Sequence, residues 1–333
     1  AIGVSTLSDL TTGDNNVAIG QGAMQELTTA SGNIAIGRAT MNVHKNGSYN
    51  IAIGNQAMTD TNAGSTSEAS AHNIFIGNLA GGGTWANVAS NYNVAIGNYS
   101  MEAALNGALN NTALGHYTLS DLTTGDSNVA LGYNAGGSLT SGFSNILIGR
   151  SAGGAATDMN STVIIGHYAG DAINTNNSQG SVLIGWEAGT SQTGGVNTFI
   201  GYHAGRYNPA GTQNTALGHE AQRGASGNSH NVNTAVGYQS MYSIGTGGNN
   251  VAVGATAMYG GVGAANQVAI GTEALYSATS GLANVAVGYR AAKALGNAEN
   301  ENIAIGYHTM YLMDEGSGAN VDENIAIGSY AMQ

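Results

Sequence analysis

A short apolar segment that ends in a glycine recurs along the whole chain, as in NNVAIG, GNIAIG and SNVALG. The residues three and one before the glycine are Val, Ile, Leu or Thr, and they share a strand face because side chains alternate along a strand. The residue between them points the other way and is usually Ala, sometimes a larger apolar residue such as Phe75. A strand with one wet face would carry a polar residue there. The pattern therefore predicts short strands with two apolar faces, one lining an interior and the other needing a partner.

The spacing of these glycines predicts how the strands are organised. Eleven of the eighteen intervals are 16 or 17 residues, and the others are 18 to 23. A period near 17 is typical of a solenoid, in which each coil relies on its neighbours to bury its apolar residues. We expect an all-β, parallel β-roll or β-solenoid of about 19 coils, a single repetitive segment over residues 1–333. The motif glycines are Gly3, Gly20, Gly37, Gly54, Gly77, Gly97, Gly115, Gly132, Gly149, Gly166, Gly185, Gly201, Gly218, Gly237, Gly254, Gly271, Gly288, Gly306 and Gly328.

The longer intervals and the two ends add two expectations. Insertions in solenoids form protruding loops, which we expect at 59–72, 81–92 and 311–323. The chain starts inside a motif and stops just after another, with no atypical capping repeat. We therefore expect this sequence to be a piece of a longer chain.

Most repeats carry Asn four residues before the glycine, and stacked Asn side chains can form an amide ladder. After the glycine, a row of Met and Leu such as Met24 and Leu119 predicts a second short strand that fills the interior. The structural ladder is represented by Asn16, Asn33, Asn50, Asn128, Gly20, Gly37, Gly54 and Gly132.

Composition argues against several classes of partner and structure. The formal net charge is −12 with only 7 Lys and Arg, which argues against nucleic acid as a partner, because binding phosphates needs a basic surface. The chain has no Cys and therefore no disulfide framework. No apolar run approaches a membrane span, so we expect no membrane insertion.

Catalytic motifs such as GxSxG, HExxH and GxxxxGK[ST] are missing, so we expect no enzyme and no cofactor. His116, His167 and His219 directly follow motif glycines, where packing is favoured over metal binding. Asp14 and Asp126 lie in LTTGD turns, where a carboxylate normally caps backbone amides rather than binding Ca²⁺.

Aromatic residues are the candidates for contact with a binding partner, here called a receptor. Trp85 lies in the 81–92 insertion, and large side chains in protruding loops point to binding. Trp186 and Tyr202 belong to a row of planar residues directly after the glycine, which stacked coils turn into a ladder. This ladder is either a packing feature or a stripe that contacts saccharide. The acidic charge of the chain favours a neutral host-surface glycan or a protein over an anionic glycan.

The NxAIGxxA pattern resembles the head repeats of trimeric autotransporter adhesins, which build a trimeric, left-handed parallel β-roll. It also resembles repeat regions of bacteriophage tail fibres, where segments like NTAVGYQSMYS (233–243) run in series. The resemblance spans the chain and implies a homotrimer with two identical chains as partners. The spacing here is longer than in typical adhesin repeats, which favours the tail-fibre variant.

These observations predict an extracellular fibre segment, on a virion or bacterial surface, that serves as spacer and host-surface adhesin. A bacterial trimeric adhesin head is the alternative. An ice-binding solenoid would need an unbroken Thr array, whereas Thr enters the strands only at Thr112, Thr198, Thr215 and Thr234. A polysaccharide-degrading spike would have to assemble its carboxylate pair between chains.

Overall fold

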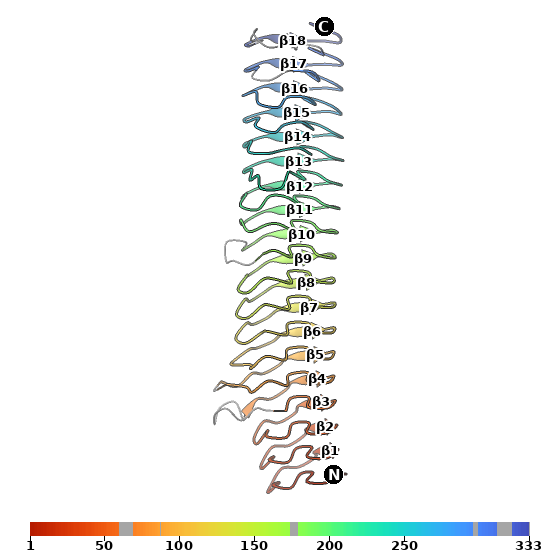
Figure 1. Ribbon diagram of the computed structural model, residues 1–333, viewed down its shortest axis with the longest axis vertical. Helices are drawn as coiled ribbons and strands as arrows, with labels where there is room; N and C mark the ends of the chain where they lie inside the picture. The colour runs from red at the N-terminus through yellow and green to blue at the C-terminus, as the bar shows by residue number, and fades with distance from the viewer. Residues whose placement is uncertain (60–68, 87, 174–178, 296–298, 312–321, 333) are drawn as a thin grey trace. The chain divides into compact units, whose positions relative to one another are not determined.

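The computed structural model describes residues 1–59, 69–86, 88–173, 179–295, 299–311 and 322–332. Every repeat after the first contributes one three-residue strand, and strands of successive coils pair in parallel, as Val17–Ile19 does with Ile34–Ile36 and Ile146–Ile148 with Val163–Ile165 (Figure 1). The described residues include no α-helix. The predicted all-β, parallel β-solenoid with a period near 17 is therefore confirmed.

The coils divide into two compact units of the same construction, the first over Ala1–His167 and the second from Tyr168 onward. The first motif, at residues 1–3, makes only a single bridge, between Ile2 and Ile19. The first unit holds β1 (Val17–Ile19), β2 (Ile34–Ile36), β3 (Ile51–Ile53), β4 (Ile74–Ile76), β5 (Val94–Ile96), β6 (Thr112–Leu114), β7 (Val129–Leu131), β8 (Ile146–Ile148) and β9 (Val163–Ile165). The second unit holds β10 (Val182–Ile184), β11 (Thr198–Ile200), β12 (Thr215–Leu217), β13 (Thr234–Val236), β14 (Val251–Val253), β15 (Val268–Ile270), β16 (Val285–Val287), β17 (Ile303–Ile305) and β18 (Ile325–Ile327).

Backbone hydrogen bonds in each coil alternate between the coil before and the coil after. The amide of Val17 donates to Asn33 O at 2.8 Å, and the amide of Gly20 donates back to Ile2 O at 2.8 Å. The turn beyond the glycine follows the same rule, since Met24 N donates to Thr40 O at 3.0 Å. Each coil thus depends on both neighbours for its backbone partners, as a solenoid requires.

The motif glycine is fixed by both backbone geometry and space. Gly132 has φ +131°, a region that L side chains rarely adopt, and a Cβ there would lie 2.7 Å from Gly149 O in the next coil. Successive coils therefore approach most closely at their glycines, and any other residue would force them apart.

The turn beyond the glycine corrects one expectation. The predicted second strand does not form, because the second and fourth residues after the glycine have left-handed backbones, as at Ala39 (φ 51°) and Met41 (φ 50°). The Met and Leu row still fills the interior as predicted, since Met41 and Leu119 are fully buried.

The middle residue of each strand faces this interior, and in several coils a large residue there is matched by a glycine four positions after the motif glycine. Ala18 is followed by Met24, whereas the large Phe75 is followed by Gly81. A Cβ on Gly81 would lie 2.6 Å from the Phe75 ring. Interior volume is therefore shared between the two positions, as close packing demands. The same exchange of large strand residue for glycine holds at Leu183 with Gly189 and at Phe199 with Gly205.

Candidate assembly and binding surfaces

The amide ladder forms as predicted. Asn33 donates from its backbone N (2.9 Å) and from Nδ2 (3.3 Å) to Asn16 Oδ1 in the preceding coil. Its Nδ2 also donates to Gly47 O, at 2.9 Å, in the following coil. Asn128 is fully buried and repeats these three bonds with Asn111 and Gly142. Each amide therefore ties three successive coils together, and a loss at one rung leaves buried partners unsatisfied.

The ladder continues in the second unit with substitutions. Asn250 Oδ1 accepts from the backbone N of Gln267 at 2.9 Å, and Gln267 Oε1 accepts from Asn284 N at 3.2 Å. The longer Gln reaches the same partners, and the ladder is interrupted by hydroxyl side chains at Thr162 and Ser181, where the Ser181 hydroxyl accepts from Asn197 N at 3.2 Å.

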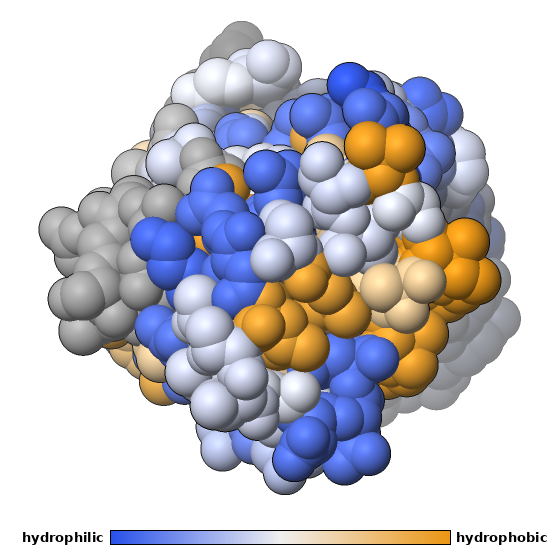
Figure 2. Space-filling view, turned by 90° about the horizontal axis from the view of Figure 1, so that it is seen from below, coloured by the Kyte–Doolittle hydropathy of each residue, from blue (hydrophilic) through white to orange (hydrophobic). Residues whose placement is uncertain are grey.

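The outer residues of the strands form an exposed apolar surface, here called the strand face, made of the first and third residue of each strand. Val129 and Leu131 are each 42 % exposed, whereas the Ala130 between them is buried. No strand carries a charged residue on this face. Figure 2 shows hydrophobic residues gathered toward one flank of the molecule, with hydrophilic residues over much of the remaining view. The interior face is thus the Ala face, and the Val/Ile face is the one left without cover in a single chain.

The planar row after the glycine forms stacked rings at the edge of the strand face. In the second unit, Tyr202 stacks on His219 at 4.9 Å and His219 on Tyr238 at 5.4 Å. In the first unit, His116 stacks on Tyr133 at 5.8 Å. Because neighbouring rings cover each other's faces, the row presents ring edges rather than open platforms. Trp186 and Tyr202 are 48 % and 42 % exposed, so these candidate contacts lie at the surface.

The position of Trp85 corrects the sequence analysis. Trp85 is fully buried, its Nε1 donates to Gly81 O at 3.0 Å, and its ring meets Phe75 edge-on at 5.6 Å. Gly81 replaces the usual Met or Leu, so Trp85 fills volume that the core would otherwise lack. Trp85 is therefore a core residue, and the predicted receptor contact there is wrong. Residues 60–68 and 312–321, which make up most of the other two expected loops, lie outside the described residues.

A second ladder, which was not predicted from the sequence, runs along the turns that follow the motif glycines of the second unit, here called the turn side. The Tyr242 and Tyr259 rings stack at 5.0 Å and 4°, and Tyr259 and Tyr276 stack at 5.1 Å and 9°. Arg223 lies over Tyr242 at 5.1 Å, and Lys293 lies over Tyr276 at 5.4 Å. The tyrosine–cation column comprises Tyr207, Arg223, Tyr242, Tyr259, Tyr276, Lys293 and Tyr311. Six of its seven residues stand five positions after a motif glycine, a register signal that was readable from the sequence.

Carboxylates lie beside the cations of this column. Glu273 Oε2 lies 2.5 Å from Lys293 Nζ and 2.8 Å from Arg290 Nε. Hydrogen bonds from Lys293 and then Arg290 hold the pKa of Glu273 below its usual value. Glu220 Oε1 lies 3.5 Å from Arg223 Nε, and Glu187 Oε2 lies 2.7 Å from Arg206. The four cations on this side are thus paired, which leaves the surface nearly balanced in charge.

The interior beneath this region is polar. Gln192, Asn208, Gln222 and His230 are fully buried, whereas the first unit places residues such as Leu122 in its interior. Burial lowers the pKa of His230 to about 4, so the ring is neutral at pH 7. The first unit buries one polar ring, His44, among mostly aliphatic residues, whereas the second unit places these four polar side chains in three successive coils.

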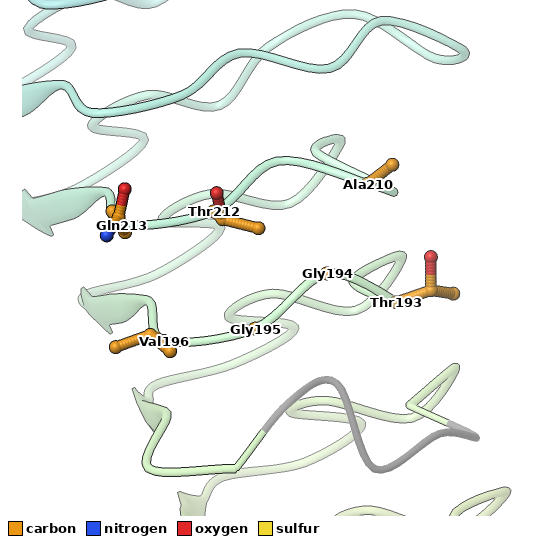
Figure 3. Close-up of a pocket in the computed structure, with 7 residues that line it drawn as sticks. All are labelled: Thr193, Gly194, Gly195, Val196, Ala210, Thr212 and Gln213. Atoms are coloured by element: carbon orange, nitrogen blue, oxygen red, sulfur yellow. The ribbon is translucent and has the colours of Figure 1, made fainter.

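An open hollow of about 480 Å³ lies between two adjacent coils of the second unit (Figure 3). Its walls carry no ionisable side chain, and the Thr193 hydroxyl donates to Pro209 O at 2.6 Å. The hollow therefore supplies backbone and hydroxyl groups but no acid, base or activated nucleophile. It is lined by Thr193, Gly194, Gly195, Val196, Ala210, Thr212 and Gln213.

The candidate metal ligands are not brought together. In the part of the chain that the structure describes, no three His, Asp or Glu side chains form a group able to hold a metal ion. Asp126 Oδ1 accepts from the backbone N of Leu109 at 2.7 Å, which confirms its interpretation as a backbone cap.

The comparisons with known proteins leave the family open. No protein-family model matches this chain, and no curated protein is significantly similar to it. Over the described ranges, no helix has the length and hydrophobicity needed for a membrane span.

Proposed function

We propose that this chain is a structural fibre segment that associates with two identical chains through its strand face. The observation that carries the proposal is the uncharged Val, Ile, Leu and Thr surface that the strands of each unit leave partly or fully exposed. Covering the remaining two-fifths of such a side chain is worth roughly 1 kcal/mol. This gain adds up over the coils whose strand residues are exposed, whereas the entropic cost of association arises only once for the whole chain.

The partner that fits this face best is another copy of the same chain. A partner that buries the face along a whole unit must present apolar groups at the spacing of the coils, and an identical solenoid does so rung for rung. The charged residues lie off the strands, so contact through the strand face buries no charged side chain of the strands. The resemblance to tail-fibre and autotransporter repeats favours three chains, and it favours a bacteriophage tail fibre, exposed outside the cell, as the parent particle. In that setting the segment serves as spacer and host-surface adhesin.

Light scattering on the purified chain tests the assembly. We expect a particle of three times the 33.3 kDa chain mass. Leu131→Glu places a charge on the strand face and should dissociate the particle. Ser141→Glu adds the same charge at an exposed site off the strands and should leave the mass unchanged. A folded, monodisperse monomer of the unmodified chain would overturn the proposal.

The adhesive role needs a separate measurement. Fluorescently labelled protein should adsorb to bacterial cells and wash off with excess unlabelled protein. Trimers that adsorb to no cells would leave the segment as a spacer alone.

A further inference from the structure

The tyrosine–cation column offers a row of free hydroxyl groups. The faces of Tyr242, Tyr259 and Tyr276 are covered by each other and by Arg223 and Lys293. Their hydroxyls make no hydrogen bond within the described part of the chain. The three side chains are neither buried nor fully exposed, so ring edges and hydroxyls reach the surface while the ring faces do not.

The fold itself does not require this column. The first unit builds the same turn with Gln25, Asn42, Ser120, Gly137 and Gly154 at the corresponding position, and its coils stack in the same way. Fold stability therefore does not account for three consecutive tyrosines at this position.

Charge and spacing define the chemistry of a ligand. Each cation on this side lies within 3.5 Å of a carboxylate, so an ionic ligand would have to break an existing pair. The hydroxyl-bearing rings repeat at 5.0 and 5.1 Å. An extended polypeptide advances about 3.3 Å per residue and falls out of step with such rungs. The sugars of an extended β-linked glycan advance by nearly one rung each and stay in step.

We propose that Tyr242, Tyr259 and Tyr276 form a binding surface for a neutral, extended polysaccharide that lies along the column, one sugar to each rung. The hydroxyls donate to and accept from sugar hydroxyl groups, and the stack fixes their spacing in advance, which lowers the ordering cost of binding. This proposal deepens the adhesive part of the proposed function, and it holds whether or not the chain is trimeric.

Affinity electrophoresis in native gels tests the proposal. The polymers are hydroxyethyl cellulose and galactomannan as neutral extended glycans, dextran as a neutral flexible one and polygalacturonate as an anionic one. The variant Y242F/Y259F/Y276F removes the three hydroxyls and keeps the stack. The control Y99F/Y117F makes the same change in a stacked pair of the first unit, whose rings lie 4.9 Å apart.

We expect at least one neutral extended polymer to retard the unmodified protein. The triple variant should bind that polymer on the order of a hundredfold more weakly, and the control should bind it normally. Equal retardation of the triple variant, equal retardation in dextran, stronger retardation in polygalacturonate, or no retardation in either extended polymer would overturn the proposal. Light scattering on the same samples distinguishes the glycan-binding proposal from the trimer proposal. Trimers that bind no glycan would refute only glycan binding, and monomers that bind glycan would refute only the trimer.

Discussion

The two units build their coils from the same strands and the same amide ladder, and they differ in their interiors and in the surface of the turn after the motif glycine. Both stack three-residue parallel strands, both carry the amide ladder, and both leave a Val/Ile strand face exposed. On the turn side, the first unit has small neutral residues such as Gly137 and Gly154, whereas the second has the tyrosine–cation column. The motif glycine and the ladder amide are therefore fixed by the hydrogen bonds and close approach of the backbone. The residues of the turn side are not constrained in this way, so they can differ between the units.

The interiors differ as well. The first unit packs Met58, Leu122 and Leu139 against strand alanines, whereas the second includes Gln192, Gln222 and His230. Buried amides need partners, and in the part of the chain that the structure describes Gln222 Oε1 has none. Gln222 directly precedes Arg223 of the tyrosine–cation column, so this coil combines a polar interior with the distinctive surface.

The largest loss of stability should follow substitution of a motif glycine, and the loss should be equal in the two units. Gly132→Ala and Gly254→Ala each place a Cβ within 2.7 Å of the next coil at φ +131° and +137°. We expect at least about 3 kcal/mol lost in the affected unit, since strain and clash add. Hydrogen exchange resolved by peptide measures each unit separately.

Gly227 provides the control for this prediction. It has φ +85° with no heavy atom within 4 Å of an added Cβ, so Gly227→Asn should be nearly neutral. A large difference between the Gly132 and Gly254 variants would show that the two glycine positions are not equivalent.

The second prediction concerns pH and separates the units. Burial lowers the pKa of His230 from 6.5 to about 4, so the unfolded chain binds the proton first as the pH falls. Its stabilisation is fully present above about pH 6.5 and is lost as the pH falls toward 4, about 3 kcal/mol in all. Hydrogen exchange at pH 7 and pH 4, corrected for intrinsic rates, should show this loss in the coils around His230.

His230→Asn should remove most of this pH dependence. His203, whose pKa is lowered by partial burial and then by Arg206, contributes in the same direction, so His203→Gln is the matched control. A His230→Asn variant that keeps the full pH dependence would contradict the assignment.

The sequence was sufficient to predict the β-solenoid because the motif recurs at a nearly constant spacing. Gly20, Gly37 and Gly54 mark the strand ends, and Asn33 and Asn50 mark the ladder, since each of these positions has one physical requirement that repeats. It was not sufficient to decide which strand face is internal, because both are apolar. Volume decides, since a thin coil that already contains Met24 has room opposite only for Ala18.

The candidate contacts were harder to predict because their environments depend on neighbouring coils. Trp85 lies in an insertion, yet its side chain is buried beside Phe75, because Gly81 leaves interior volume that the indole ring fills. The tyrosine column depends on register counted from the glycine, and a search for single motifs does not detect it. Trp186 and Tyr202 are exposed as expected, and their role as receptor contacts stays a prediction.

The smallest of these effects tests whether the amide ladder contributes equally in the two units. Asn128→Ala in the first unit and Asn250→Ala in the second each remove an amide that accepts from the next coil and donates to a backbone carbonyl, Gly142 O at 2.7 Å and Ala264 O at 2.8 Å. The carbonyl and the neighbouring backbone amide then lose their partners inside the protein, so we expect a loss of about 1–3 kcal/mol in each case. Asn250→Gln is the control, because Gln267 already holds the same place one coil later and should nearly restore stability. Melting temperatures and hydrogen exchange measure the three variants. Unchanged stability in both alanine variants would mean that water replaces these bonds, and a loss confined to Asn128→Ala would mean that the polar interior of the second unit compensates for the missing amide.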